Sequence, residues 1–357
     1  MYKILSVVGA RPQFIKAAAV SRAIRRSSRL SEVMVHTGQH FDEDMSDVFF
    51  EQLEIPPPAH RLGVHGGSHG EMTGRMLPAV ERVLQEEKPD LVLVYGDTNT
   101  TLAGALAAAK LNQSVGHVEA GLRSFNRRMP EEINRVLTDH LSSLLFCPTE
   151  TAVTNLDAEG ITRGVAQVGD VMYDCSLFAA ERSRSEDGVL DRFGLGEGQY
   201  GVATVHRQES TDDAAKLERI LGYLKSESGR RPIVFPVHPR TRQALARNGI
   251  NLEGLIECSP LGYLEMASLV SRAAVVYTDS GGLQKEAYFY RVPCVTLRNE
   301  TEWVETVQAG WNRLWSVEDY LPRTEIHQYG EGDAAGKIIA MLEDYLDSGI
   351  AAVGRAG

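Results

Sequence analysis

Short runs of apolar, mostly β-branched residues recur along the chain, and each is followed by a polar or glycine-containing turn and then by an amphipathic stretch. This alternation is typical of βα units, because neighbouring parallel strands are joined by a crossover helix and are buried on both faces. In the first half, the expected strands are 3–8, 32–36, 90–95, 114–118 and 144–147, and the clearest helix is 100–111. In the second half, the expected strands are 201–205, 232–237, 255–258, 274–278 and 294–297. The pattern predicts an α/β protein with two doubly wound parallel sheets in series.

The length of 357 residues corresponds to about two domains of ordinary size. A boundary falls near 164–170, which has the pattern of a strand that ends in a turn, and 184–201 is a polar connection into the second sheet. The periodicity of the last expected helix, 334–346, does not decide the domain to which it belongs. The predicted domain ranges are 1–168 with 343–357 for the first domain and 169–342 for the second. Since no Gly/Ser-rich or Pro-rich linker separates the halves, we expect closely packed domains with a ligand cleft between them.

The amino-acid composition excludes several classes of protein. Apolar residues make up 43% and charged residues 24% of the chain, as in ordinary globular proteins. With 37 basic and 48 acidic side chains, the formal charge of −11 argues against general binding to nucleic acid or to an anionic membrane. No apolar run approaches the ~20 residues of a membrane span and the N-terminus reads as a strand, so a cytoplasmic protein is expected. Cys147, Cys175, Cys258 and Cys294 lack metal-ligand spacing and are expected to be buried thiols.

Residues that directly follow strands are the first candidates for chemistry, because ligands of open parallel sheets bind where strands end and helices begin. The first strand runs into G-A-R-P-Q-F-I-K (9–16), which is neither a dinucleotide-binding glycine motif nor a P-loop. Arg11 offers a planar fork and Lys16 a point charge to a phosphate at this helix start. The alternative is a solvated turn with two surface cations.

Three carboxylates follow strands or begin helices in the first half of the chain. Asp97 is either a functional acid or the N-cap of the helix 100–111. Glu119, at the mouth of an apolar strand, is either a general acid or base or an ion-pair partner of Arg123. Glu131 follows Pro130, where acids are also ordinary residues of a first helical turn.

Two histidines end neighbouring strands in the second half: His206 follows 201–205 and His238 follows 232–237. A single buried histidine is more often satisfied by the backbone, but two at one sheet edge favour a functional role for His206.

The stretch T-D-S-G-G-L-Q-K-E-A (278–287) passes from a strand into a helix. The hydroxyl of Ser280 and the bare N–H groups of Gly281 and Gly282 suit a diphosphate. Glu286, one turn further, either accepts hydrogen bonds from ribose hydroxyls or is a solvated acid. A predicted diphosphate-binding site together with cations and carboxylates indicates a nucleotide-sugar enzyme. The motifs do not resemble a hydride-transfer site or a metal triad.

Over almost its whole length, the sequence resembles the non-hydrolysing UDP-N-acetylglucosamine 2-epimerases. The matching motifs are G-A-R-P-Q-F-I-K (9–16), T-G-Q-H (37–40), Y-G-D-T-N-T (95–100), H-V-E-A-G-L-R (117–123), P-E-E-I-N-R (130–135), H-R-Q-E-S (206–210), P-V-H-P-R (236–240) and T-D-S-G-G-L-Q-K-E-A (278–287). One motif alone is a weak signal, but all of them in this order are specific. The resemblance implies a GT-B-type α/β fold, in which two Rossmann-like doubly wound parallel-sheet domains face each other across a cleft.

The resemblance also implies a reaction and a set of roles. Family members interconvert UDP-GlcNAc and UDP-ManNAc by eliminating UDP, which gives a 2-acetamidoglucal, and by adding UDP back with C2 inverted. No cofactor or metal is implied, and the implied partners are a UDP-sugar, UDP and a second copy in a homodimer. The implied residues are Asp97, Glu119 and Glu131 as acid/base carboxylates, His206 at the diphosphate, and Arg11, Lys16, Arg207, Ser280, Gly281, Gly282 and Glu286 as substrate-binding groups.

Two stretches depart from the family pattern. Where many members have T-E-R-P-E, this chain has T-E-W-V-E (301–305), a form also found in relatives that act on UDP-2,3-diacetamido-2,3-dideoxy-glucuronate. This uronate is the alternative substrate, and Arg127 and Arg128 would meet its carboxylate unless they are solvated loop residues. Residues 41–47 lack the M-L-D-Q-like continuation of members that a second UDP-GlcNAc activates, so the pattern does not support such activation. A hydrolysing epimerase, a GT-B glycosyltransferase and a non-catalytic sensor are the remaining alternatives.

Overall fold

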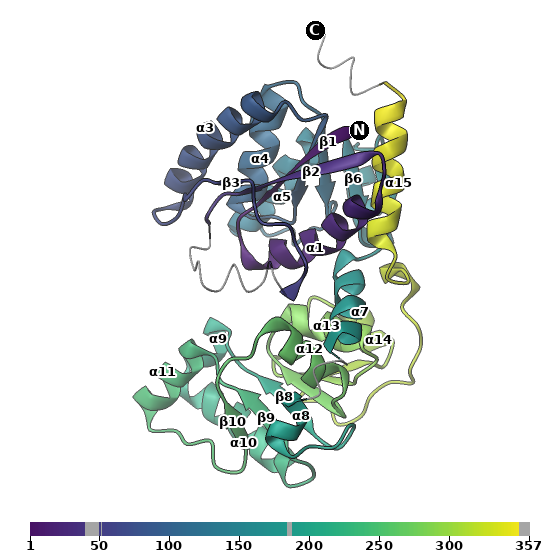
Figure 1. Cartoon of the computed structure of the whole chain (residues 1–357). Coiled ribbons are helices and arrows are strands. Elements are labelled where there is room, and N and C mark those ends of the chain that lie inside the picture. The colour runs from purple at the N-terminus through teal and green to yellow at the C-terminus, as the bar shows by residue number, and fades with distance from the viewer. Residues whose placement is uncertain (40–49, 51, 184–187, 350–357) are drawn as a thin grey trace. The chain divides into compact units, whose positions relative to one another are not determined.

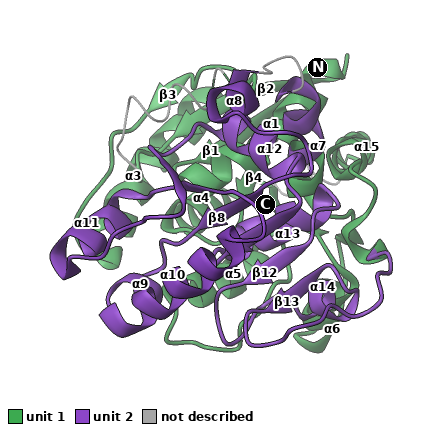
Figure 2. Ribbon diagram, turned by 90° about the horizontal axis from the view of Figure 1, so that it is seen from below, with its two compact units in different colours: residues 1–175, 327–357 green, residues 176–326 purple. Residues whose placement is uncertain are grey.

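The structure is a computed structural model that describes residues 1–39, 50, 52–183 and 188–349. The chain forms two compact units (Figure 2). Unit 1 comprises residues 1–175 and 327–357, and unit 2 comprises residues 176–326. The sequence places the division at residues 168 and 342, whereas the units divide at 175 and 326, so that the whole of the last helix belongs to unit 1.

Unit 1 is built on a seven-stranded parallel sheet with the order β3-β2-β1-β4-β5-β6-β7. Its strands are β1 (Tyr2–Val8), β2 (Leu30–His36), β3 (His60–Arg61), β4 (Leu91–Tyr95), β5 (Val115–Val118), β6 (Leu144–Cys147) and β7 (Val165–Gln167). The expected strands of this half are confirmed to within two residues at each end. β3 is not predicted by the apolar pattern, because this two-residue edge strand is His-Arg.

Helices cover the sheet of unit 1 on both faces. They are α1 (Arg11–Arg26), α3 (His69–Glu87), α4 (Asn99–Lys110), α5 (Pro130–Leu141), α6 (Glu150–Ala158), the 3-10 turn His327–Tyr329 and α15 (Ala334–Asp347), while α7 (Val171–Ser183) spans the division between the two units. Apolar side chains of α3 and α4 pack with those of β1, β4 and β5 in one core cluster. α15, yellow in Figure 1, lies against α1. Pairing of the two helices brings the C-terminal end of the described chain back to the first sheet.

Unit 2 repeats the architecture with a six-stranded parallel sheet of the order β10-β9-β8-β11-β12-β13. Its strands are β8 (Gly201–Thr204), β9 (Ile233–Pro236), β10 (Ile256–Cys258), β11 (Val275–Thr278), β12 (Cys294–Thr296) and β13 (Asn312–Leu314). Its helices are α8 (Gly188–Phe193), α9 (Gln208–Thr211), α10 (Ala214–Ser228), α11 (Pro239–Asn248), α12 (Tyr263–Ser271), α13 (Gly281–Phe289) and α14 (Val304–Gln308). Two core clusters pack the sheet against these helices. The polar connection expected at 184–201 is partly wrong, because Val189 and Leu190 of α8 are buried there.

In each sheet the strand order changes direction between two adjacent strands, β1 and β4 in unit 1 and β8 and β11 in unit 2. Loops that leave such a pair at the carboxyl edge diverge and open a crevice for ligands. The motifs after β1, β4, β8 and β11 are therefore at the ligand-binding edge of their own sheet. No helix within the described ranges has both the length and the apolar character that crossing a bilayer requires.

Candidate active site

Lys16 of α1 and Glu119 after β5 meet at the carboxyl edge of unit 1. Lys16 Nζ and Glu119 Oε2 form an ion pair, and the two side chains are only 14% and 12% exposed. Gly96 lies beside them, since a Cβ atom on Gly96 would be 3.3 Å from Lys16 Nζ and 3.4 Å from Glu119 Oε2. The alternative that Glu119 pairs with Arg123 is wrong. Arg123 instead forms ion pairs with Asp139 and with Glu159, the residue that follows α6. The structure thus brings together a carboxylate and a cation that were predicted as candidates from two separate motifs.

The backbone of Glu119 is in the left-handed region, with φ of 73°. This conformation costs a residue other than glycine about 1–3 kcal/mol and persists only where the surroundings hold it. The N–H groups of Glu119 and Ala120 both donate to Phe146 O at 3.1 Å, and Gly121 N donates to Asp139 Oδ2 at 3.1 Å. These bonds fix the loop on both sides of Glu119 and so fix the direction of its carboxylate.

Asp97 is not the N-cap of α4, so that alternative is wrong. The cap is Thr98, whose hydroxyl accepts from Thr101 N at 3.4 Å. The Asp97 carboxylate instead forms an ion pair with Arg135 of α5, and its carbonyl oxygen accepts from Asn134 Nδ2 at 2.9 Å. Two adjacent residues of α5 therefore hold the backbone and the side chain of Asp97.

The first turn of α5 holds two acids with different surroundings. Glu132 is buried and accepts from Ser124 N at 2.9 Å and from Phe125 N at 2.8 Å. Burial alone would raise the pKa of Glu132, but these N–H donors and Arg135 hold it below its ordinary value. Glu131 is partly buried and has no side-chain hydrogen bond or ion pair to any residue of the described ranges. Glu132 is thus an anchor for its loop, whereas the carboxylate of Glu131 is not engaged in such a role.

The start of α13 is the corresponding feature of unit 2. Ser280 caps the helix, since its hydroxyl accepts from Leu283 N at 3.4 Å. The N–H groups of Gly281 and Gly282 precede the first intrahelical bond and point out of the helix end. A Cβ atom on Gly282 would have only Ser280 Oγ, at 3.9 Å, within contact range. This helix end is therefore open enough for an anion, and Glu286 lies partly buried one turn along the same helix.

His206 and Arg207 leave β8 beside this helix start. The fully buried carboxylate of Asp279 accepts from His206 N at 3.0 Å and from Arg207 N at 2.9 Å. His206 Nδ1 lies 3.4 Å from Asp279 Oδ1, and the His206 ring is 5.5 Å from the ring of His238. Asp279 therefore connects the turn after β8 with the turn after β11 and sets the position of both candidate residues.

Arg207 also has a carboxylate neighbour at this edge. Its Nη2 lies 3.3 Å from Glu302 Oε1 and would be 3.4 Å from a Cβ atom on Gly281. Burial alone would raise the pKa of Glu302, but hydrogen bonds from Arg298 and the charge of Arg207 hold it below its ordinary value. The edge of unit 2 thus gathers cations, with an ionised carboxylate, around a helix start.

Sequence reasoning missed several residues that hold these positions. Gln13 is buried, accepts from Gly9 N at 2.9 Å and donates to Tyr95 O at 2.8 Å, so it connects the turns after β1 and β4. Three of these positioning residues lie within the motifs given above: Gln13, Arg135 and Asp279. The signal that could have identified them is a polar side chain in a segment that is otherwise expected to be buried. Asp139 lies in the last turn of α5, outside the quoted motifs, with no such signal.

The remaining predicted residues are placed as follows. Arg11 is the exposed first residue of α1, at the same edge as Lys16. His40 and the departure at 41–47 lie outside the described residues. Cys147, Cys175 and Cys294 are buried as expected, whereas Cys258 is partly exposed. Within the described ranges, no group of three or more His, Cys, Asp or Glu side chains is arranged to hold a metal ion.

Comparisons with known proteins agree with this geometry. Residues 22–343 match the family described as UDP-N-acetylglucosamine 2-epimerase. The UDP-2,3-diacetamido-2,3-dideoxy-D-glucuronate 2-epimerase of Pseudomonas aeruginosa is 55% identical, over 95% of this chain and 99% of its own length. The UDP-N-acetylglucosamine 2-epimerase of Methanococcus maripaludis is 45% identical, over 88% of each chain. The crystal structure of Methanocaldococcus jannaschii UDP-GlcNAc 2-epimerase in complex with UDP-GlcNAc and UDP has 40% identity and a TM-score of 0.82, over 96% of this chain and 99% of that one.

Proposed function

Because this chain belongs to the UDP-N-acetylglucosamine 2-epimerase family, we propose that it interconverts UDP-GlcNAc and UDP-ManNAc by inverting C2 without hydrolysis. The observation that carries the proposal is the group of carboxylates at the edge of unit 1. Asp97 and Glu119 are each paired with a cation, and Glu131 lies in the first turn of the helix that holds Asp97. Acids on separate elements are what a reaction needs when it removes a proton from one face of C2 and returns it to the other.

The chemistry of C2 favours elimination as the route. The C2 hydrogen is not acidic, because no carbonyl group is next to it. A carboxylate takes the C2 proton, the C1–C2 double bond forms, and the C1–O bond breaks with its electron pair leaving on UDP. In the return step, a carboxylic acid protonates C2 from the opposite face while a UDP oxygen forms the bond to C1. We assign these proton transfers to Asp97, Glu119 and Glu131.

The leaving diphosphate needs positive groups that are already in place. In unit 2, the N–H groups of Gly281 and Gly282, the hydroxyl of Ser280 and the guanidinium of Arg207 supply them, with His206 as a proton donor and Glu286 for the ribose. In unit 1, Arg11 and Lys16 add charge near the carboxylates. The pairing of Lys16 with Glu119 supports a second role for this lysine, which is to hold the Glu119 carboxylate in one position.

The test is proton NMR of the purified chain with UDP-GlcNAc alone in deuterated water. Solvent deuterium should enter C2 while UDP stays attached to the sugar. Stoichiometric release of UDP would indicate a hydrolysing epimerase, and release of UDP only after an acceptor is added, with no deuterium at C2, would indicate a glycosyltransferase. Either of these two outcomes would contradict the proposal.

A second candidate substrate is UDP-2,3-diacetamido-2,3-dideoxy-glucuronate. It is favoured by the 55% identity to the enzyme of Pseudomonas aeruginosa that carries this name. It is also favoured by T-E-W-V-E at 301–305 and by the exposed side chains of Arg127 and Arg128, which suit a sugar carboxylate. The same exchange assay with both UDP-sugars decides between them, because a strong preference for the uronate would replace UDP-GlcNAc as the substrate and leave the reaction unchanged.

The chain is further proposed to act as a homodimer. Met129, Ile133 and Leu137 recur at intervals of four residues on α5 and are exposed, as is Phe125 just before the helix. A two-fold axis allows such an apolar stripe to cover its own copy. Light scattering should give the mass of a dimer for the unmodified chain and of a monomer for Ile133→Asp. Leu321→Asp, at an exposed apolar position of unit 2, is the control and should stay dimeric. A monomeric unmodified chain would exclude the dimer.

A further inference from the structure

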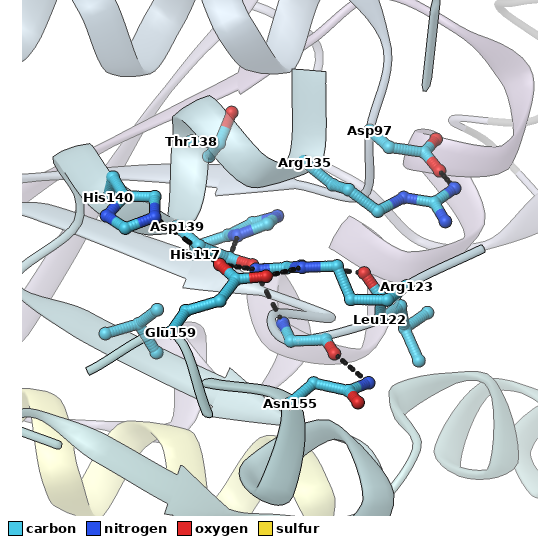
Figure 3. Close-up of polar contacts among 12 residues, drawn as sticks. Asp97, His117, Leu122, Arg123, Arg135, Thr138, Asp139, His140, Asn155 and Glu159 are labelled. Carbon is cyan, nitrogen blue, oxygen red and sulfur yellow. Dashed lines mark hydrogen bonds and ion pairs between the residues drawn. The ribbon is translucent and has the colours of Figure 1, made fainter. Parts of the chain in front are cut away.

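A row of polar contacts in unit 1 joins Glu159, Arg123, Asp139 and His117 (Figure 3). Glu159 accepts from Arg123 Nε at 2.7 Å and from its Nη2 at 2.9 Å. Arg123 Nη1 donates to Asp139 Oδ2 at 2.7 Å, and His117 Nδ1 lies 2.6 Å from Asp139 Oδ1. The row alternates in charge and ends at His117 of β5, whose side chain is fully buried together with that of Asp139.

Both ring nitrogens of His117 face acceptors. Nε2 lies 2.7 Å from the carbonyl oxygen of Gly96, which has no hydrogen to give. Burial alone would raise the pKa of Asp139, but His117 and Arg123 hold it below its ordinary value, so Asp139 is a carboxylate and also accepts. Each ring nitrogen of His117 therefore has a hydrogen-bond partner on its own side of the ring. Two short hydrogen bonds on opposite sides of the ring prevent its rotation.

The two bonds of His117 reach both loops that carry the proposed acids. The Gly96 carbonyl belongs to the peptide group that joins Gly96 to Asp97, and Gly96 also lies against the Lys16–Glu119 pair. On the other side, Asp139 holds Gly121 N at 3.1 Å and so closes the loop in which Glu119 is left-handed. A single side chain thus sets the relative position of the turn after β4 and the turn after β5.

We propose that His117 is a positioning residue for the epimerisation, which holds the Gly96–Asp97 peptide and the Glu119 loop at a fixed separation through its two hydrogen bonds. The proposal rests on the proposed function, since it concerns the same carboxylates. His117 does not touch the substrate. Its removal should slow the chemical step and leave binding of UDP unchanged, because displacement of a catalytic group by about 1 Å can cost ~10²-fold in rate.

Two substitutions separate the hydrogen bonds. In His117→Asn the amide nitrogen takes the place of Nδ1 and still reaches Asp139, but nothing reaches Gly96. In His117→Gln the amide nitrogen takes the place of Nε2 and restores the donor to the Gly96 carbonyl. We expect kcat of His117→Asn to fall about 10²-fold with KM unchanged, and His117→Gln to recover about tenfold of that loss. The measurement is the rate of deuterium entry at C2, with the melting temperature recorded for each variant.

A residue that only supports the fold would lower the melting temperature in both variants and leave equal kcat values in the folded protein. Equal kcat values, or full activity of His117→Asn, would overturn the proposal. Nitrogen-15 NMR of the unmodified chain gives a readout without turnover: the ring nitrogen that faces the Gly96 carbonyl should carry a hydrogen, and a bare nitrogen there would contradict the geometry. If the unmodified chain exchanges no UDP-sugar at all, it is the proposed function that fails, and the NMR result still tests the hydrogen bonds.

Discussion

The carboxyl edges of the two sheets have the same topology but carry charge in different ways. At the edge of unit 1, carboxylates are matched with single cations, Glu119 with Lys16 and Asp97 with Arg135, and a buried row of further ion pairs lies in the same unit. At the edge of unit 2, the start of α13 presents backbone N–H groups, and the ion pair of Arg207 with Glu302 is half exposed.

On the proposed function, this difference separates the residues for chemistry from the residues for binding. A group that transfers protons has to be held in one place and kept in one ionisation state, which buried ion pairs and a strained backbone achieve in unit 1. A group that binds a diphosphate has to offer donors that need no rearrangement and that the ligand can reach, which a glycine-rich helix start achieves in unit 2. Substitutions at the first edge should therefore change kcat, and substitutions at the second edge should change binding.

The largest effect is expected for Glu119→Gln. The amide cannot take a proton, so the rate of deuterium entry at C2 should fall about 10²- to 10⁴-fold. Binding of UDP, measured by calorimetry, should remain, because the substitution leaves in place the N–H donors of α13 and the cations that are proposed to hold the diphosphate. Glu300→Gln changes an exposed acid after β12 and is the matched control. Near-normal turnover of Glu119→Gln would remove this residue from the acid/base role and would leave the contrast between the two edges without its main support.

A smaller effect, on binding alone, is expected for Gly282→Ala. The added methyl group meets no atom closer than 3.9 Å, so the folded chain accommodates it and its melting temperature should not fall. A phosphate oxygen bonded to this N–H would be pushed away, and loss of one charge-assisted hydrogen bond weakens binding roughly ten- to hundredfold. Gly222→Ala in α10, where a Cβ atom also has open space, is the control. Unchanged affinity for UDP would show that no phosphate lies against Gly282.

From the sequence, the candidate residues at both sheet edges could be predicted better than the residues with which they form ion pairs. Strand ends were located by the apolar runs, and Lys16, Asp97 and Glu119 follow directly from them. Their pairing depends on which strands are neighbours, β1 with β4 and β4 with β5, and the order of strands is not contained in the periodicity. Arg123 illustrates the limit, because it is four residues from Glu119 in sequence but points to Asp139, on a helix that the chain reaches only later.

Unit 1 also contains a partly buried acid, Asp174, whose surroundings can be compared with those of Asp139. His117 and Arg123 hold the pKa of Asp139 below its ordinary value. The carboxylate of Asp174 in α7 accepts from backbone donors at the start of α15, Ala335 N at 2.9 Å and Ala334 N at 3.2 Å. Burial raises the pKa of Asp174 from 3.8 to about 6, since the two N–H donors only partly offset the loss of water. Glu132 and Asp139, which each have an arginine neighbour besides their other donors, have a lowered pKa, whereas Asp174, which accepts from the N–H groups of α15, has a raised pKa.

The consequence is a pH dependence of stability that Asp174→Asn should remove, with no effect on turnover. A pKa that is higher in the folded chain means that folding takes up a proton, so the contribution of Asp174 to stability is fully present below pH 3.8 and is lost as the pH rises through about 6. The asparagine variant should therefore gain about 3 kcal/mol relative to the unmodified chain between acidic and neutral pH. Urea unfolding followed by circular dichroism across this range measures the difference, and Asp157→Asn, at an exposed acid of α6, is the control. If the two chains keep a constant difference in stability, the carboxylate at the start of α15 is as well compensated as Asp139, and N–H donors suffice to bury a charge in this sheet.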